Sequence, residues 1–254
     1  MIALGIHRVL QFCLSRSRMA NMEALVAAAK VGKYATSESG DTLEMIERPS
    51  GGVSFVLADG QRSGKPAKAI ANVVTRKALS LLADGVRDGA AARAASDYLY
   101  TYRSGKVVAT LNILSIDTHS QTMVIVRNNP APVLVIEDGT LRALDTPSLA
   151  VGSRKGIRPE IQEIPLQEGL RVVVYTDGLT HAGDRKGQPL DIIGCIEELS
   201  HGTEAAPSYW ADHLLEQALI ADDSRAADDI TVLVAAIQPG SGDDVRHLSV
   251  QLSF

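Results

Sequence analysis

The sequence has 254 residues, of which 45% are hydrophobic and 22% are charged, and its formal net charge is −5. A chain of this length and apolar content can bury a sizeable core, which excludes an intrinsically disordered protein. The acidic balance argues against nucleic acid or an anionic membrane surface as the main partner, because neither surface attracts a protein of the same sign.

The cysteine usage and the first residues bear on location. Cys13 and Cys195 are far apart and outside any Cys-x-x-Cys spacing, so the sequence predicts neither a disulfide framework nor a zinc site and favours the reducing cytoplasm. Residues 1–21 are mildly apolar and basic, but Arg8 interrupts the apolar run and no small-residue cleavage site follows. We interpret them as a non-secretory extension, either a short helix that docks on the body or a partner, or an upstream start before an alternative initiator methionine.

The chain from Met22 onward begins with strands. Residues 23–31 are mostly apolar and run straight into a polar loop. Two short β-branched and apolar runs follow, 42–47 and 53–58, and the turn-forming Pro-Ser-Gly-Gly between them predicts a hairpin. The hairpin is expected to end at the Asp-Gly pair that begins with Asp59.

Four helices are predicted. Beyond Gly64, apolar residues recur every three or four positions, which predicts a helix that ends at the Asp-Gly pair of Asp84. A second amphipathic helix is expected over about 89–103. Two more are expected near the end of the chain, over 192–199 and 205–219.

The remaining strand-like runs are 107–117, 121–128, 131–138, 140–145, 161–166, 171–178 and 229–237. The first four are joined by tight connections, of which Asp138-Gly139 is typical of a hairpin, and they predict an antiparallel meander. The last run is continuously apolar, which predicts a buried strand.

Strands, two helices, many strands, two helices and a last strand are hard to divide between independent cores. The simplest packing is a single α+β domain over residues 22–238, an α-β-β-α sandwich of two mostly antiparallel sheets flanked by helices. Residues 239–254 begin with a linker-like Pro-Gly-Ser-Gly composition and are expected to form a flexible tail.

Four acidic sites share one context, because each lies at the end of an apolar strand or in a turn beside one: Asp41, Asp59, Asp177 and Asp228, the last followed by Asp229. A rigid sheet can present strand-end side chains to a shared cleft, and oxygen-only ligands suit magnesium or manganese. If the sheets bring these carboxylates together, they repel one another unless a cation lies among them. A single Asp-Gly pair is more typical of a turn, so the metal site depends on the set.

Other catalytic patterns lack support. The six histidines are scattered, with no His-x-x-x-His pair, and no nucleophile elbow occurs, which argues against zinc and serine hydrolases. The segment Gly-Gln-Arg-Ser-Gly-Lys-Pro lacks the spacing of a phosphate-binding P-loop.

Between Ser39 and Ile237, four motifs follow one another: Ser-Gly-Asp at Asp41, a longer Asp-Gly motif over 58–67, Thr-Asp-Gly at Asp177, and Asp-Asp-Ile-Thr from Asp228. In this order and context they resemble the metal-dependent protein phosphatases of type 2C. The resemblance is to the bacterial branch that includes the stage II sporulation protein E phosphatase and the phosphatases of sigma-factor partner switching.

The resemblance implies a set of metal ligands. Asp59 would bridge two metal ions, and the Gly60 carbonyl would join one of them. Asp177 and Asp228 would complete the other site, and Asp41 would lie on the Gly60 side, directly or through water. Asp59, Asp177 and Asp228 are therefore the expected catalytic residues, with two Mn²⁺ or Mg²⁺ ions that activate water for attack on phosphorus. Only the first aspartate of the last pair matches the family's ligand, so a metal contact for Asp229 is left open.

Some positions depart from the family's pattern. His181 stands where the family's Thr-Asp-Gly motif usually continues to a glutamate, and Asn128–Pro132 replace its usual Gly-His-x-Pro. Arg62 is a candidate contact for the substrate phosphate, because a guanidinium suits phosphate oxygens, although a solvated arginine is an equal alternative.

The expected function is that of a phosphoserine or phosphothreonine protein phosphatase. Its expected substrate is a phosphorylated regulatory protein such as an anti-sigma-factor antagonist. The alternative is a catalytically degenerate module that keeps the fold and binds or senses a partner. A small-molecule phosphohydrolase is chemically equivalent at the metals and would be favoured by a closed pocket.

Overall fold

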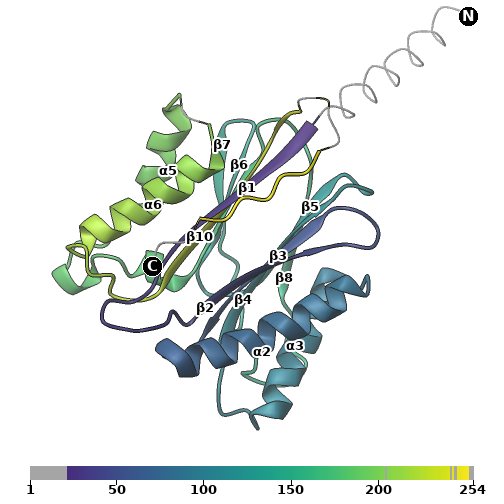
Figure 1. The fold of residues 1–254 in the computed structure, drawn as a ribbon, viewed down its shortest axis with the longest axis vertical. Helices are drawn as coiled ribbons and strands as arrows, with labels where there is room; N and C mark the ends of the chain where they lie inside the picture. Colours follow the sequence, from purple (N-terminus) through teal and green to yellow (C-terminus); the bar gives the residue numbers. More distant parts are fainter. Residues whose placement is uncertain (1–21, 204, 241, 243–244, 252–254) are drawn as a thin grey trace, which may run out of the picture.

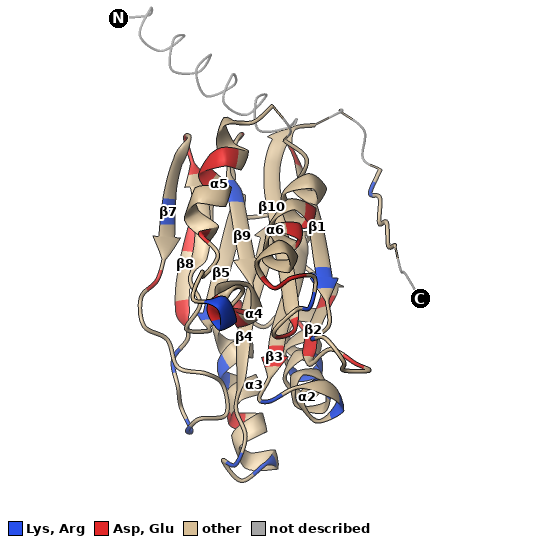
Figure 2. Cartoon of the chain, turned by 90° about the vertical axis from the view of Figure 1, so that its left-hand side faces the viewer, with Lys and Arg blue, Asp and Glu red and all other residues tan. Residues whose placement is uncertain are grey.

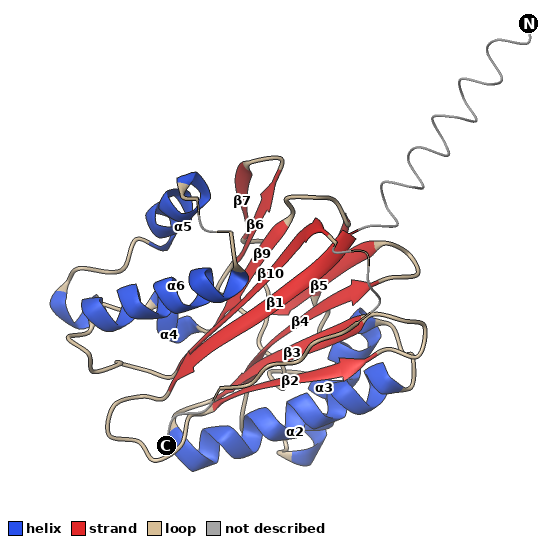
Figure 3. Cartoon of the chain, turned by 45° about the horizontal axis from the view of Figure 1, so that its top comes forward, coloured by secondary structure: helices blue, strands red, loops and turns tan. Residues whose placement is uncertain are grey.

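The computed structural model describes residues 22–203, 205–240, 242 and 245–251. Two five-stranded sheets pack face to face, and helices cover the outer face of each (Figure 1). The layers are clearest in Figure 3, where the strands lie between two groups of helices. The predicted α+β class and the α-β-β-α sandwich are confirmed. The interpretation of residues 1–21 lies outside the described residues.

All strand pairs in both sheets are antiparallel. The first sheet has the order β1 (Met22–Val31), β10 (Ile230–Pro239), β9 (Arg171–Tyr175), β6 (Val133–Glu137) and β7 (Thr140–Leu144). The second sheet has the order β2 (Asp41–Glu47), β3 (Val53–Gly60), β4 (Ala109–Asp117), β5 (Thr122–Asn128) and β8 (Glu160–Pro165).

The helices fall into two groups. On the second sheet lie α2 (Gly64–Ala83) and α3 (Asp88–Tyr102). On the first sheet side lie α4 (Asp177–Thr180), α5 (Ile192–His201) and α6 (Pro207–Ala221), with a short 3-10 turn, η1 (Asp184–Lys186). The four predicted helices are confirmed to within a few residues, whereas α4 and η1 are not predicted from the sequence.

Three buried apolar clusters correspond to the three interfaces between layers. One lies between the sheets, one between α2, α3 and the second sheet, and one between α5, α6 and the first sheet. Strand β3 contributes side chains to two of these interfaces. Val56 faces the helices, and Leu57 faces the other sheet. This burial on both faces explains why the strand is nearly continuously apolar in sequence.

The predicted four-strand meander is wrong. β4 and β5 form a hairpin in the second sheet, and β6 and β7 form a hairpin in the first sheet, so the chain crosses between the sheets after Asn128. β5 pairs next with β8, and β6 pairs with β9. Strands buried on both faces carry no polar alternation that would assign them to one sheet, so short connections alone gave the wrong topology.

The edge strands β1 and β2 lie on the same side of the sandwich (Figure 1). β10 extends through Pro239, and residues 242 and 245–251 have no helix or strand. Among the described residues, no helix combines the length and apolar character needed to cross a membrane.

Candidate metal centre

Asp41 and Asp59 lie opposite each other on neighbouring strands of the second sheet. Asp41 is the first residue of β2, Asp59 is the last but one of β3, and the antiparallel register pairs them directly. Both project from the face that also carries Leu43 and Leu57, which pack in the core between the sheets. Asp41 is fully buried and Asp59 is half-buried.

Asp177 and Asp228 come from the first sheet. Asp177 begins α4 directly after β9, and Asp228 lies two residues before β10, which pairs with β9. The two segments are tied together, because the Thr176 N–H donates to the Thr231 carbonyl at 3.1 Å and the Thr231 N–H donates to the Thr176 hydroxyl at 3.0 Å. In Figure 2, acidic segments are visible at β2, at β3 and beside α4.

Asp41 connects the two sheets at this end of the sandwich. Its Oδ2 atom accepts hydrogen bonds from the hydroxyls of Thr176 at 3.0 Å and Thr231 at 2.6 Å, both on the first sheet side. Its main-chain carbonyl accepts from the ammonium groups of Lys30 on β1 at 2.7 Å and Lys68 on α2 at 2.6 Å. The position of Asp41 is therefore fixed by β1, α2, β10 and the residue that precedes α4.

The clustered carboxyls raise one another's pKa. Burial, followed by the charges of Asp41 and Asp177, raises the pKa of Asp59 to about 9. Burial raises the pKa of Asp41 to about 6, although hydrogen bonds from the two threonines act in the opposite direction. Burial and the charge of Asp228 raise the pKa of Asp177. Near neutral pH the carboxyl cluster therefore retains a proton that a cation could displace.

The donor set suits hard divalent cations in its chemistry. Every candidate side-chain ligand is a carboxylate oxygen, and the buried Oδ1 atom of Asp41 has no hydrogen-bond partner. Asp59 lies within hydrogen-bonding reach of Asp41 and of Asp177. In the described part of the chain, however, no three His, Cys, Asp or Glu side chains are already arranged to hold an ion.

Two glycines of the motifs allow the elements to approach closely. A Cβ atom on Gly60 would lie 2.0 Å from the Ala67 carbonyl oxygen, where α2 begins beside the end of β3. A Cβ atom on Gly178 would lie 2.1 Å from the Asp229 carbonyl oxygen, where α4 meets the segment before β10. Each Asp-Gly pair thus supplies an aspartate and the space that brings the next element against it.

The paired aspartates Asp228 and Asp229 have different surroundings. The Asp228 side chain is 42% exposed and lies 3.5 Å from the Lys33 ammonium. Asp229 is buried, and its two oxygens accept the N–H groups of Lys33 at 2.9 Å and of Gly40 at 2.8 Å. Both oxygens therefore hold the loop before Asp41, which leaves Asp228 as the member of the pair that is open to a ligand.

Several residues at the centre were not assigned from the sequence. Thr176 and Thr231 belong to the motifs already noted, and a threonine beside a motif aspartate is the signal that could have identified them. Lys30 and Lys68 have no local signal, because they meet Asp41 only through the packing of β1, β2 and α2.

The candidate phosphate contact lies in a strained turn. Arg62 is exposed between β3 and α2 and has a φ of +82°, which is uncommon for a residue other than glycine. In the middle motif, the Asn128 and Asn129 side-chain amides donate to the carbonyls of Leu149 and Tyr175. These two asparagines are buried and have structural roles here.

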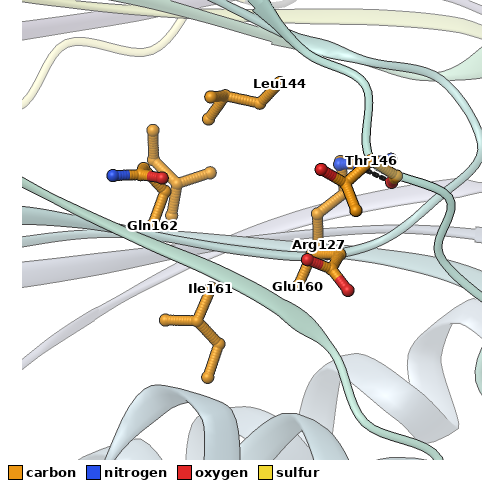
Figure 4. A pocket seen from close by; sticks show the side chains of 7 residues that line it. Arg127, Leu144, Thr146, Glu160, Ile161 and Gln162 are labelled. Atoms are coloured by element: carbon orange, nitrogen blue, oxygen red, sulfur yellow. Dashed lines mark hydrogen bonds between the residues drawn. The ribbon is translucent and has the colours of Figure 1, made fainter.

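A small cavity of about 50 Å³ lies away from the aspartates, between β5, β8 and the end of β7 (Figure 4). It is lined by Arg127, Thr146 and Glu160 among others, and the buried Arg127 guanidinium donates to the Thr146 carbonyl. None of the predicted site residues lines it.

Comparisons with known proteins agree with this fold. A model of the family described as stage II sporulation protein E (SpoIIE) matches residues 49–238. No curated protein sequence matches the chain.

Three solved structures are similar. The first is the phosphatase domain with a regulatory fragment of SpoIIE from Bacillus subtilis, with TM-score 0.76 and 18% identity over 87% of this chain and 65% of that one. The second is the catalytic domain of the serine/threonine phosphatase PstP with two manganese ions, with TM-score 0.65 and 18% identity over 85% and 99%. The third contains the RsbU and RsbW domains of Rv1364c from Mycobacterium tuberculosis, with TM-score 0.69 and 20% identity over 87% and 63%.

At these identities the solved structures show a shared fold, and the chain spans less than two thirds of the first and third of them. The fold is that of the type 2C phosphatases, as the sequence motifs implied. Because the family model covers most of the sequence, the chain belongs to the SpoIIE family of phosphatase domains.

Proposed function

We propose that this protein is a metal-dependent phosphatase that removes phosphate from serine or threonine of a regulatory protein. The observation that carries the proposal is the meeting of Asp41, Asp59 and Asp177 from separate motifs. Burial, and then the charges of Asp41 and Asp177, raise the pKa of Asp59 to about 9. A buried cluster of this kind is costly for folding, and such clusters are retained where carboxylates bind a cation or substrate.

The proposed ligands are the carboxylates of Asp41, Asp59, Asp177 and Asp228 and the main-chain carbonyl of Gly60. Manganese and magnesium both suit this all-oxygen set, and the similar PstP structure contains two manganese ions. When bound, two such ions supply a water of lowered pKa and offset the negative charge of the phosphoryl group. The proposed catalytic residues are Asp59, Asp177 and Asp228.

The surrounding residues have distinct proposed tasks. Thr176 and Thr231 hold one oxygen of Asp41 and leave its other oxygen unpaired. The ammonium groups of Lys30 and Lys68 place two positive charges beside the carboxyl cluster, which offsets part of its repulsion. Arg62, in the exposed turn after β3, is proposed to contact the phosphate of the incoming protein.

The proposed substrate is a phosphorylated regulatory protein, such as an anti-sigma-factor antagonist. Membership of the SpoIIE family and the likeness to a structure that contains RsbU and RsbW domains support this class. A cytoplasmic location is proposed from the cysteine usage, since Cys195 is a free thiol and no disulfide is expected.

One observation favours a second candidate function, a binding module without catalysis. In the described residues the carboxyls do not form a finished set of three metal ligands. The two functions make opposite predictions about metal binding, because a degenerate module would not need the cluster to open around an ion.

The test is hydrolysis of an aryl phosphate and of a phosphoserine peptide with manganese, magnesium or chelator. We compare the wild type with Asp177→Asn and with Asp184→Asn, which changes an exposed aspartate near Asp177 that pairs with His181. Metal-stimulated turnover that is lost with chelator and in Asp177→Asn, but kept in Asp184→Asn, is expected. A folded wild type that neither binds manganese in calorimetry nor turns over either substrate would support the binding module instead.

A further inference from the structure

β2 leaves one edge of the second sheet open. Among the strands of the described chain it pairs with β3 alone. The Arg48 N–H donates to the Gly52 carbonyl at 3.0 Å, and these two residues lie opposite each other in the continued β2–β3 register. In an antiparallel pair, hydrogen-bonded residues alternate with residues that do not bond to the partner strand. Counting back from Arg48, every second residue of β2 therefore bonds to β3. The main-chain N–H and C=O groups of Leu43, Met45 and Glu47 are therefore directed away from β3, toward the open edge.

The space between the two sheets is also open along this side. Met45 shares the face of Leu43, which packs in the core between the sheets, yet Met45 is 39% exposed. On the opposite sheet, Val26 of β1 packs in the same core, and by alternation Ala24 and Ala28 project the same way. Both alanines are exposed, so a strip of apolar surface follows β1 and β2.

The last part of the sequence has the pattern of a strand with one apolar face. Leu248, Val250, Leu252 and Phe254 alternate with polar residues, and this period of two is typical of a half-buried strand. In the described part, Leu248 is 76% exposed and Val250 is 72% exposed. Figure 2 shows residues 245–251 running beside the sandwich without joining a sheet.

One contact places this segment at the open edge. The Arg246 guanidinium lies 3.4 Å from the Glu47 carboxylate, at the last residue of β2. The direction of the chain agrees with this placement, because β10 ends at Pro239, opposite Met22 at the start of β1. A segment that continues from Arg246 along β2 toward Asp41 runs antiparallel to β2.

We infer that residues 246–251 dock on the free edge of β2 as a sixth, antiparallel strand of the second sheet. The occupant of the open edge is this chain's own segment, because Arg246 already contacts Glu47 of the same chain. The docked strand closes the apolar side between β1 and β2.

The Arg246–Glu47 contact sets the register. With these two residues opposite each other, Leu248 lies opposite Met45, and the next apolar residue, Val250, lies opposite Leu43. Opposite residues share a face of the sheet, so both added side chains point into the open strip between the sheets.

The site limits how far the added pairing extends. The outward main-chain carbonyl of Asp41 is already taken by the ammonium groups of Lys30 and Lys68. The new ladder therefore ends at Leu43 and does not displace the contacts of the carboxyl cluster.

Residue-resolved amide hydrogen exchange tests this inference. The amides of Leu43, Met45 and Glu47 face the open edge, whereas β3 protects the amides between them in either case. With the segment docked, all three edge amides exchange slowly in the wild-type monomer, and so do the amides of Arg246, Leu248 and Val250, which pair with them.

Two double variants with equal charge changes test which face of the docked segment packs against the protein. Leu248→Lys with Val250→Lys places charges between the sheets and should abolish protection at the three edge amides. Ser249→Lys with Gln251→Lys places the same charges on the opposite face and should leave that protection in place.

Fast exchange of the edge amides in the wild type would refute the docking. Equal protection in both double variants would also refute it, because the apolar face would then have no part. Protection that grows with protein concentration, together with a dimer in light scattering, would assign the edge to the segment of a second copy and overturn the intramolecular docking.

Discussion

The buried carboxylate of Asp229 should contribute strongly to the free energy of unfolding. Its oxygens accept the N–H groups of Lys33 at 2.9 Å and of Gly40 at 2.8 Å, and so hold the β1–β2 loop against the start of β10. Asp229→Ala leaves the Gly40 N–H buried and unpaired, while the Lys33 N–H is part-buried and can recover a water. Since hydrogen bonds to charged groups contribute about 1.5–3 kcal/mol each, the expected loss of unfolding free energy is about 3 kcal/mol.

The assay is urea unfolding in chelator, so that metal binding does not contribute to the difference. Asp228→Ala is the control, because it removes the neighbouring aspartate, whose side chain is 42% exposed and lies 3.5 Å from Lys33. The Asp228 carboxylate also accepts the Asp229 N–H at 3.0 Å, but this N–H is part-buried and can recover a water. Exposed ion pairs contribute about 0–1 kcal/mol, so this variant should unfold within about 1 kcal/mol of the wild type. If Asp229→Ala also stays within that range, the reasoning that Asp229 anchors the loop is wrong.

Two further predictions concern the carboxyl cluster and the glycines around it. In chelator, the folded chain holds more protons than the unfolded chain because the pKa of Asp59 is raised from 3.8 to about 9, so the unfolding free energy should fall as pH rises through that window. Urea titrations across the neutral range should show this fall, and Asp59→Asn should flatten it; an unchanged slope in the variant would contradict the assignment. Gly178→Ala would place a Cβ 2.1 Å from the Asp229 carbonyl oxygen and should lower the thermal midpoint sharply or prevent folding. Gly139→Ala, with φ of +73° and open space around it, should cost only about 1–2 kcal/mol, and a similar loss in both variants would show that backbone conformation, rather than close packing, governs both sites.

The local patterns of the sequence predict most elements but not their partners. The apolar spacing of three and four from Ala67 to Leu81 predicts α2, and that face is buried in the structure except at Leu81, which is partly buried. The hairpin of β2 and β3 follows from its turn, whereas the direct pairing of Asp41 with Asp59 is known only from the structure. The meander failed because β5 and β6 are buried and apolar on both faces, so nothing local indicates that one belongs to each sheet.

The candidate site shows the same division. The motif aspartates are visible in sequence because each follows or precedes an apolar strand. The ammonium groups of Lys30 and Lys68 both donate to the Asp41 carbonyl, although the lysines are 11 and 27 residues away from Asp41 in the sequence. No sequence pattern near either lysine predicts this contact. The different surroundings of Asp228 and Asp229 also depend on residues far away in the sequence. Asp229 accepts the N–H of Lys33, which lies 196 residues earlier in the chain.

The pairing of β1 with β10 has a consequence for how the protein is made. β1 is an edge strand whose strand partner in the described chain is β10, the last strand of the domain. During synthesis β1 leaves the ribosome before the other strands of the domain, and the edge that pairs with β10 stays unpaired until β10 follows. Contacts between such distant segments form slowly, and an unpaired apolar strand is a target for chaperones and for aggregation until its partner arrives. Synthesis of β10 is therefore the event that allows the first sheet to be completed.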